Sequence, residues 1–240
     1  MRYLNHIEHY IIDAQEFDYF CHDPFMVQEL LRRYEEIFSL TSFKPGDKVL
    51  EIGSGDGSGA SKAKKFDLQY YMLDISTANL NRIKQLNIYN KIYPVTGDTY
   101  RIPFKNARLN AIIMSEVLEH LENPVDALKQ VCQALKENGI LILTVPYKEK
   151  IIYYLCIHCN KRTPAHAHLH SFDEKKMEEI MNTAGFKIIK ISKSINKVAQ
   201  RLYIYRILKF LPFRIWKFFD HLFNFLIDKP TSYIFVVKKN

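Results

Sequence analysis

The sequence of 240 residues lacks long apolar runs and most of the features that mark secreted proteins. It has no stretch of about 18 consecutive apolar residues, so we expect no membrane-spanning helix. The first residues, MRYLNHIEHYIID, carry acids and histidines where a secretory signal peptide has its apolar core. Of four cysteines only Cys156 and Cys159 lie close together, which argues against a secreted disulfide framework. We therefore expect a cytoplasmic protein.

Glycine is also scarce, and half of the eight glycines fall in one short stretch, VLEIGSGDGSG. Gly53, Gly55, Gly57 and Gly59 alternate there, directly after an apolar run that contains Glu51. Such a backbone can pass close to a ligand and present amide groups at a helix N-terminus. The alternative is a tight turn that binds nothing.

The remaining sequence alternates short apolar runs with segments of helical spacing, which predicts βαβ units on a mostly parallel sheet. We expect seven strands, namely Lys48–Ile52, Gln69–Leu73, Ile92–Val95, Leu109–Met114, Ile140–Val145, Phe186–Ile191 and Tyr233–Val237. We expect helices over 24–39, after the glycines, from Ser76 or Thr77 to Gln85, from Pro124 to Lys136, and from a capping box at Ser171–Glu174 to Ala184.

Acidic side chains follow several of these strands, at the edge where open sheets bind ligands. Asp74 ends the second strand, 21 residues after Gly53, where a carboxylate can accept hydrogen bonds from ribose hydroxyls. That position suits NAD as well as an adenosyl ligand. Asp98 follows the third strand and can reach an adenine amino group. The fourth strand leads into SEVLEHLENP.

In this order the motifs VLEIGSGDGSG, YYMLDIS, TGDTYRIPF, IIMSEVLEHLENP, LKENGILILTVP and FDEKKMEEIMNTAGF resemble a class I S-adenosylmethionine-dependent methyltransferase. They are most similar to the group that includes the ubiquinone- and menaquinone-biosynthesis enzymes, and they cover roughly residues 45–192. The resemblance implies an α/β, Rossmann-like, seven-stranded sheet with helices on both faces and an antiparallel last strand. Two departures are Glu137-Asn138-Gly139 in place of Pro-Gly-Gly and about 40 extra residues before the last strand.

The resemblance also implies the roles of individual residues around S-adenosylmethionine. Glu51 would organise the glycine loop near the methionine amino group, and Asp74 would hold the ribose. Asp98 would bind the adenine amino group. The other implied cofactor residues are Gly53, Gly55, Gly57, Ile75, Thr99, Ser115 and, in the lid-like segment before the fold, Tyr10.

For catalysis, Glu116 would face the sulfonium and the substrate entrance. If the acceptor atom is an oxygen, it can need a general base. His120, four residues after Glu116, is the first candidate, with His166, His168 and His170 as rivals. The alternative is that Glu119 and His120 merely start a helix.

A second cluster, CIHCNKRTPAHAHLHSF, has the residue types of a tetrahedral zinc site, although not the spacing of a standard finger. Its predicted ligands are Cys156, Cys159, His168 and His170. The alternative is a pair of reduced cysteines, with His168 and His170 lining the substrate pocket or bonding the backbone. A redox role for the two cysteines fits less well, because no thioredoxin-like sequence surrounds them.

Most of the net charge of +8 falls in residues 193–230, where eight Lys and Arg face two Asp, a net +6. Within this segment, polar residues recur at helical spacing and are expected to share one side of a helix: Arg214, Lys217, Asp220, His221, Asn224 and Asp228. Apolar residues fill the rest of the circle: Ile215, Trp216, Phe218, Phe219, Leu222, Phe223 and Phe225. Over 201–228 we weigh a membrane surface, packing onto the protein's own body and a dimer interface. Nucleic acid fits poorly, because the charges are few.

Three parts follow: a helical lid over 1–44, a methyltransferase core over 45–192 plus 231–240, and a basic amphipathic helical insertion over 193–230. The leading hypothesis is an S-adenosylmethionine-dependent methyltransferase acting on a small-molecule, lipid or lipid-linked acceptor, at oxygen. The alternatives are an NAD-dependent oxidoreductase and a non-catalytic S-adenosylmethionine-binding module.

Overall fold

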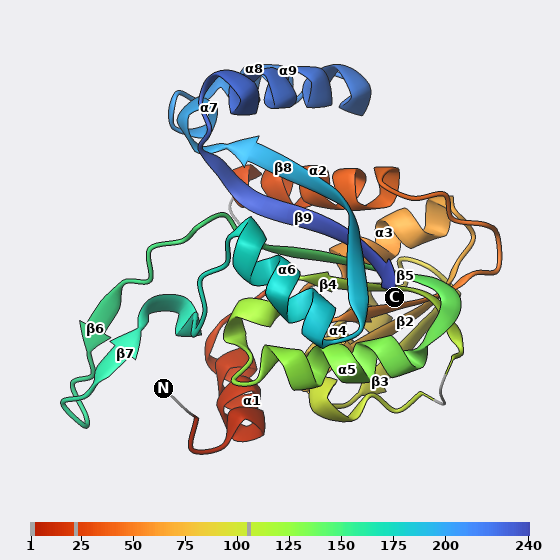
Figure 1. Ribbon diagram of the computed structural model, residues 1–240, viewed down its shortest axis with the longest axis vertical. Helices are drawn as coiled ribbons and strands as arrows, with labels where there is room; N and C mark the ends of the chain where they lie inside the picture. The colour runs from red at the N-terminus through yellow and green to blue at the C-terminus, as the bar shows by residue number, and fades with distance from the viewer. Residues whose placement is uncertain (1–2, 22–23, 105–106) are drawn as a thin grey trace.

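The computed structural model describes residues 3–21, 24–104 and 107–240, arranged around a seven-stranded sheet (Figure 1). The spatial order of the strands is β3-β2-β1-β4-β5-β9-β8, and β9 alone runs antiparallel to its neighbours. In chain order the strands are β1 (Lys48–Ile52), β2 (Gln69–Asp74), β3 (Ile92–Thr96), β4 (Leu109–Ser115), β5 (Leu135–Pro146), β8 (Phe186–Asn196) and β9 (Pro230–Lys239). The predicted fold class is confirmed.

Helices cover both faces of the sheet because alternate strand residues are apolar on each side. One face packs against α2 (Pro24–Ser39), α3 (Ser58–Lys65) and α4 (Thr77–Gln85). The other packs against α5 (Pro124–Ala134) and α6 (Glu174–Thr183). On β1, Leu50 and Ile52 belong to the second core, whereas Val49 belongs to the first.

Several element boundaries differ from the predicted ones for local reasons. Helix α6 begins at Glu174 because the side chain of Asp173, not Ser171, accepts the hydrogen bond from the Lys176 amide. Helix α5 ends at Ala134, two residues early, because Leu135 already has extended backbone and pairs with Leu109 of β4. Strand β5 is correspondingly longer than predicted.

The predicted N-terminal lid consists of two helices with different contacts. Helix α1 (His6–Glu16) buries no side chain completely and lies at the carboxyl ends of the strands. Helix α2 instead packs on the sheet through Tyr34, Ile37 and Phe38, which are buried in its core. Only α1 is therefore placed as a cover for a site at that edge.

The insertion forms three helices, α7 (Lys197–Arg201), α8 (Ile204–Leu208) and α9 (Phe213–Leu226), around a small core of their own. Trp216 is buried there, together with Asp220 and Asn224, which were predicted to share the polar side of α9. Asp220 accepts hydrogen bonds from the Ile195 and Asn196 amides at 3.0 and 3.1 Å. These hydrogen bonds compensate the cost of burying the Asp220 carboxyl. The helix therefore buries part of its polar side and exposes apolar residues to solvent.

The insertion also docks on α2 through polar groups. Glu36 is fully buried and accepts a hydrogen bond from the Ser194 hydroxyl at 2.6 Å. The Gln200 amide donates to Glu29 at 2.8 Å. Helix α2 therefore has the sheet on one side and the insertion on another.

Among the residues that the structure describes, no helix combines the length and the apolar character needed to cross a membrane.

Candidate functional site

A cavity of about 210 Å³ opens at the carboxyl ends of β1, β2 and β4, beneath α1. Nine of the residues predicted to bind the cofactor or to act in catalysis line it: Tyr10, Gly53, Gly55, Asp74, Ile75, Asp98, Thr99, Glu116 and His120. The structure thus brings residues from α1, three strand ends and the turn after β4 to one place. Sequence reasoning did not find His6, Asp13, Tyr19 and Asn79, which also line the cavity.

Three predicted residues lie behind the cavity wall. Glu51 is completely buried and accepts a hydrogen bond from the Tyr34 hydroxyl of α2. Burial raises the pKa of Glu51 to about 8, so its carboxyl is mainly protonated at neutral pH. Gly57 packs against Ile83, and the Ser115 hydroxyl shares a hydrogen bond of 3.1 Å with Thr144.

The glycine loop is shaped by two different requirements. Gly53 has φ +73° and its amide donates to the Leu73 carbonyl at 2.9 Å. A Cβ at Gly53 would lie 2.5 Å from Cγ2 of Val117, so no larger residue fits. Gly55 also has positive φ, but a Cβ there would meet nothing within 4 Å. The loop is therefore tight at Gly53 and open at Gly55.

Asp74 and Asp98 present carboxylates at the ends of two neighbouring strands. Asp74 accepts hydrogen bonds from the amides of Ser54 and Ser76 at 3.0 and 2.9 Å, although burial raises its pKa. Asp98 contacts the lid, because its Oδ2 lies 3.0 Å from Nε2 of His6. His6 precedes Tyr10 by four residues, so the helical period was the signal that places both on one face of α1.

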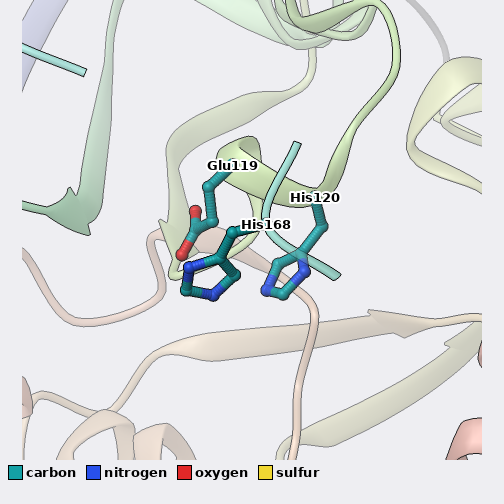
Figure 2. Close-up of side chains that lie close together, drawn as sticks. All are labelled: Glu119, His120 and His168. Carbon is teal, nitrogen blue, oxygen red and sulfur yellow. The ribbon is translucent and has the colours of Figure 1, made fainter. Parts of the chain in front are cut away.

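His120 lines the cavity from the 3₁₀ turn η2 (Leu118–His120) after β4. Burial, and then the neighbouring His168, lower the pKa of His120 to about 3, so its imidazole is uncharged at neutral pH. Its Nδ1 has no hydrogen-bond partner within the described residues. Glu119, His120 and His168 point toward one another (Figure 2) and offer ligand atoms within 4.8 Å of one another.

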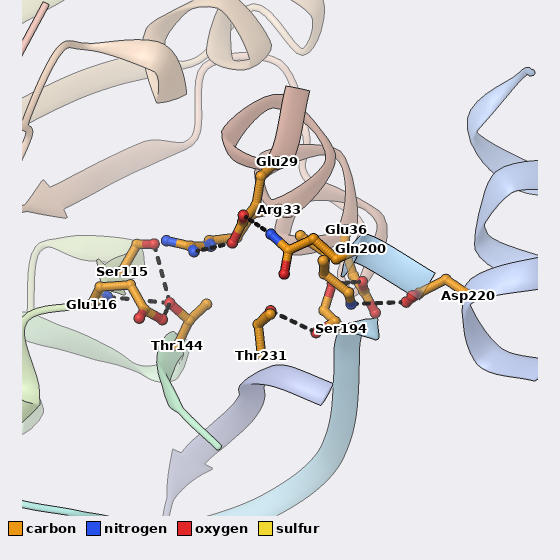
Figure 3. Close-up of polar contacts among 11 residues, drawn as sticks. Glu29, Arg33, Glu36, Ser115, Glu116, Thr144, Ser194, Gln200, Asp220 and Thr231 are labelled. Atoms are coloured by element: carbon orange, nitrogen blue, oxygen red, sulfur yellow. Dashed lines mark hydrogen bonds and ion pairs between the residues drawn. The ribbon is translucent and has the colours of Figure 1, made fainter. Parts of the chain in front are cut away.

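Glu116 occupies the sharp turn that follows β4, with φ +53°. Its carboxylate accepts a hydrogen bond from the Thr144 hydroxyl at 2.8 Å, and Arg33 of α2 reaches toward it (Figure 3). Burial acts to lower the pKa of Arg33, but the nearby carboxylates of Glu116 and Glu29 raise it overall. The positive φ is a strained conformation of the kind that concentrates at functional sites.

Comparison with known proteins agrees with this geometry. The model of the methyltransferase-domain family matches residues 23–191, which is more than half of the chain. The chain belongs to this methyltransferase family. The resemblance to class I S-adenosylmethionine-dependent methyltransferases is thereby confirmed, and the oxidoreductase alternative falls away.

Relatives of this methyltransferase are distant. An uncharacterised protein of Methanocaldococcus jannaschii is 25% identical over 162 residues, covering 68% of this chain and 75% of that protein. The ubiquinone/menaquinone biosynthesis C-methyltransferase UbiE of Neisseria meningitidis is 31% identical over 106 residues. That alignment covers 42% of this chain and 43% of the relative, less than half of its length.

Among solved structures, the phosphoethanolamine N-methyltransferase 2 of Haemonchus contortus, in complex with S-adenosyl-L-methionine, shares the fold with a TM-score of 0.67. The identity is 16%, over 97% of this chain and 60% of that one. S-adenosylmethionine is the cofactor of the family.

The predicted zinc ligands of this methyltransferase are not brought together. Cys156 and Cys159 lie in the turn between β6 (Tyr153–Leu155) and β7 (Arg162–Pro164), a hairpin that projects from the body (Figure 1). His168 bonds Glu149, and Nε2 of His170 lies 2.8 Å from the Leu121 carbonyl oxygen. Within the described residues, the group of three metal-ligating side chains that does form contains neither cysteine nor His170.

Proposed function

We propose that this protein transfers the methyl group of S-adenosylmethionine to an oxygen atom of a small-molecule, lipid or lipid-linked acceptor. The acceptor oxygen releases its proton to solvent water and forms a bond to the methyl carbon while the carbon–sulfur bond breaks. The sulfonium becomes the neutral thioether of S-adenosylhomocysteine. One observation carries the proposal: a single cavity joins the carboxylates of Asp74 and Asp98 to the uncharged imidazole of His120.

In this proposal Asp74 accepts hydrogen bonds from the ribose hydroxyls, and Asp98 with Thr99 binds the adenine. Gly53 and Gly55 let the methionine part approach the backbone. Glu116, His120 and Tyr10 line the cavity on the acceptor side. Glu51, Gly57 and Ser115 act from behind the wall by fixing the shape of the loop.

The test is calorimetric titration of the purified protein with S-adenosylhomocysteine, which binds without reacting. We expect one site with micromolar affinity and no binding of NAD. Asp74→Ala should weaken binding at least tenfold, about 1.4 kcal/mol, because the ribose hydroxyls lose their acceptor. Asp126→Ala removes an exposed carboxylate that does not line the cavity and is the matched control. Equal affinities for the two variants would contradict the assignment of Asp74.

Turnover requires a separate measurement, because a non-catalytic binding module would also bind S-adenosylhomocysteine. Incubation with methyl-labelled S-adenosylmethionine and a lipid extract should yield labelled product in the organic phase. Binding without any transfer to lipid or to small hydroxylated compounds would favour the binding module.

The outward face of the insertion supports a lipid-like acceptor. Large apolar side chains are exposed on it: Ile207, Phe210, Phe218, Phe225 and Leu226. Arg206 and Lys209 lie 4.6 and 4.8 Å from the rings of Tyr203 and Phe210, which keeps positive charge beside this apolar face. Apolar side chains flanked by cations complement an anionic bilayer surface. The proposed occupant of this face is therefore an anionic membrane surface.

Sedimentation with liposomes tests this surface. The wild type should sediment with vesicles that contain phosphatidylserine and should remain in the supernatant with neutral vesicles. Phe218→Glu combined with Phe225→Glu should abolish sedimentation, whereas Ile157→Glu, at a fully exposed apolar residue of the β6–β7 turn, should not. A wild type that never sediments, or a dimer that the double variant dissociates, would contradict a membrane role.

A further inference from the structure

Glu119 differs from the other acids that the structure buries completely. Glu36 accepts hydrogen bonds from two serine hydroxyls, Glu51 from Tyr34, and Asp220 from Tyr205 and two amides. Glu119 is also 0% exposed, yet neither of its carboxyl oxygens has a hydrogen-bond partner among the described residues. An unpaired buried carboxyl costs several kcal/mol, so its partner is expected to be a ligand.

Two imidazoles meet this carboxyl. The ligand atoms of Glu119, His120 and His168 all lie within 4.8 Å of one another, and Figure 2 shows the three side chains converging. The rings of His120 and His168 are 4.7 Å apart at an angle of 79°. The Nδ1 atom of His120 is buried and unpartnered among the described residues.

The cluster is held in place by its surroundings. The amides of Leu169 and His170 donate to the Glu119 carbonyl at 2.8 and 3.2 Å, which ties the histidine segment to η2. Nδ1 of His168 bonds the carboxylate of Glu149, leaving Nε2 as the ring nitrogen available to a ligand. A carboxylate on the outer nitrogen of a histidine is the usual support of a metal-ligating imidazole.

We propose that Glu119, His120 and His168 bind one divalent transition-metal ion. One carboxylate and two imidazoles suit first-row metals and leave coordination positions open. Ligand atoms around such an ion, at about 2.1 Å from it, lie roughly 3 to 4 Å apart, so the three side chains need only a small contraction. The nearby carboxylates of Glu116 and Glu149 add negative potential that attracts a cation, and Arg33 offsets part of it.

The site deepens the proposed function and rests on it, because His120 also lines the cofactor cavity. Because His120 belongs to both, an ion bound by the three side chains would border the cofactor cavity. It would take an acceptor with an oxygen atom as a further ligand, which orients that oxygen and favours loss of its proton. The substrate class that we infer is therefore a phenol, enol or vicinal hydroxyl compound.

The experiment uses the full chain, freed of metal by dialysis against a chelator, and titrated with Co²⁺ while the visible absorption is recorded. We expect saturation at one Co²⁺ per chain. Glu119→Gln, which keeps the shape and removes the charge, and His168→Ala should each weaken binding at least tenfold. His170→Ala, two residues away and bonded to a backbone carbonyl, and Cys156→Ser with Cys159→Ser are the matched controls and should bind as the wild type does.

Several results would overturn the site: no Co²⁺ binding by the wild type, unchanged binding by Glu119→Gln and His168→Ala, or binding lost with the cysteines. Titration of the same samples with S-adenosylhomocysteine shows that each variant is folded. It also separates the two proposals. Cofactor binding without Co²⁺ binding refutes the metal site alone, and Co²⁺ binding without cofactor binding refutes the proposed function alone.

Discussion

Glu51→Gln is expected to make the stability of the protein less dependent on pH. Glu51 is fully buried behind the glycine loop, and burial raises its pKa to about 8, against an ordinary value of 4.5. Folding at neutral pH must therefore add a proton to this carboxyl. Glutamine has the same shape, accepts the hydrogen bond of Tyr34 and needs no proton.

The sign and the size follow from linkage. Between pH 4.5 and 8 the native state holds a proton that the unfolded state has lost, so the wild type loses stability as the pH rises. Each pH unit is worth about 1.4 kcal/mol, which gives about 5 kcal/mol over the whole range and about 3 kcal/mol between pH 5 and 7. Below pH 4.5 both states are protonated and the difference vanishes.

Urea unfolding of the wild type and of Glu51→Gln at pH 5, 6, 7 and 8 measures this difference. The gap between the two proteins should widen steadily in favour of the variant. Glu137→Gln makes the same chemical change at an exposed position and should follow the wild type. A constant gap between wild type and Glu51→Gln would refute the reasoning, because it would mean that Glu51 is ionised in the native state.

Two further outcomes concern the loop and the insertion. Gly53→Ala should destabilise the protein by about 1–3 kcal/mol in thermal unfolding, because φ is +73° and its Cβ would meet Val117. Adding Val117→Ala should restore only part of the lost stability, since the backbone strain at residue 53 remains. Full recovery of the stability would contradict a role for the positive φ. Asp220→Ala should leave the buried amides of Ile195 and Asn196 unpaired, which should lower the stability by roughly 1–3 kcal/mol for each donor. Hydrogen exchange should then rise in 193–230, and unaltered exchange would argue against this network.

The parallel sheet could be predicted from the sequence because each strand carries its own signal. A buried apolar run ends at glycine, proline or an acid, and these endings also locate the cofactor residues. The positions of Asp74 and Asp98 at two such endings were therefore enough to predict that both carboxylates lie at the ligand-binding edge of the sheet. The lid residues were less accessible: Tyr10 was found by resemblance, while His6 needed the knowledge that α1 lies across Asp98.

Pairing between distant segments could not be predicted from local patterns. Cys156, Cys159, His168 and His170 suggested a zinc site by their residue types. The cysteines instead lie on the projecting hairpin, and His168 lies beside Glu119 and His120. The prediction of which side of α9 faces solvent was wrong for a related reason. Its polar residues were expected to share one side, and nothing local showed that backbone amides of β8 would bind Asp220.

Helix α2 gives two distant surfaces a common support. Its Glu29 and Glu36 hold the insertion, and its Arg33, which pairs with Glu29 at 3.3 Å, lies near Glu116 beside the cavity. A displacement of the insertion would therefore also displace α2, whose Arg33 guanidinium lies beside the site. We therefore expect the two surfaces to be thermodynamically coupled. Because such coupling is reciprocal, a ligand in the cavity should also change how firmly the outer helices are held.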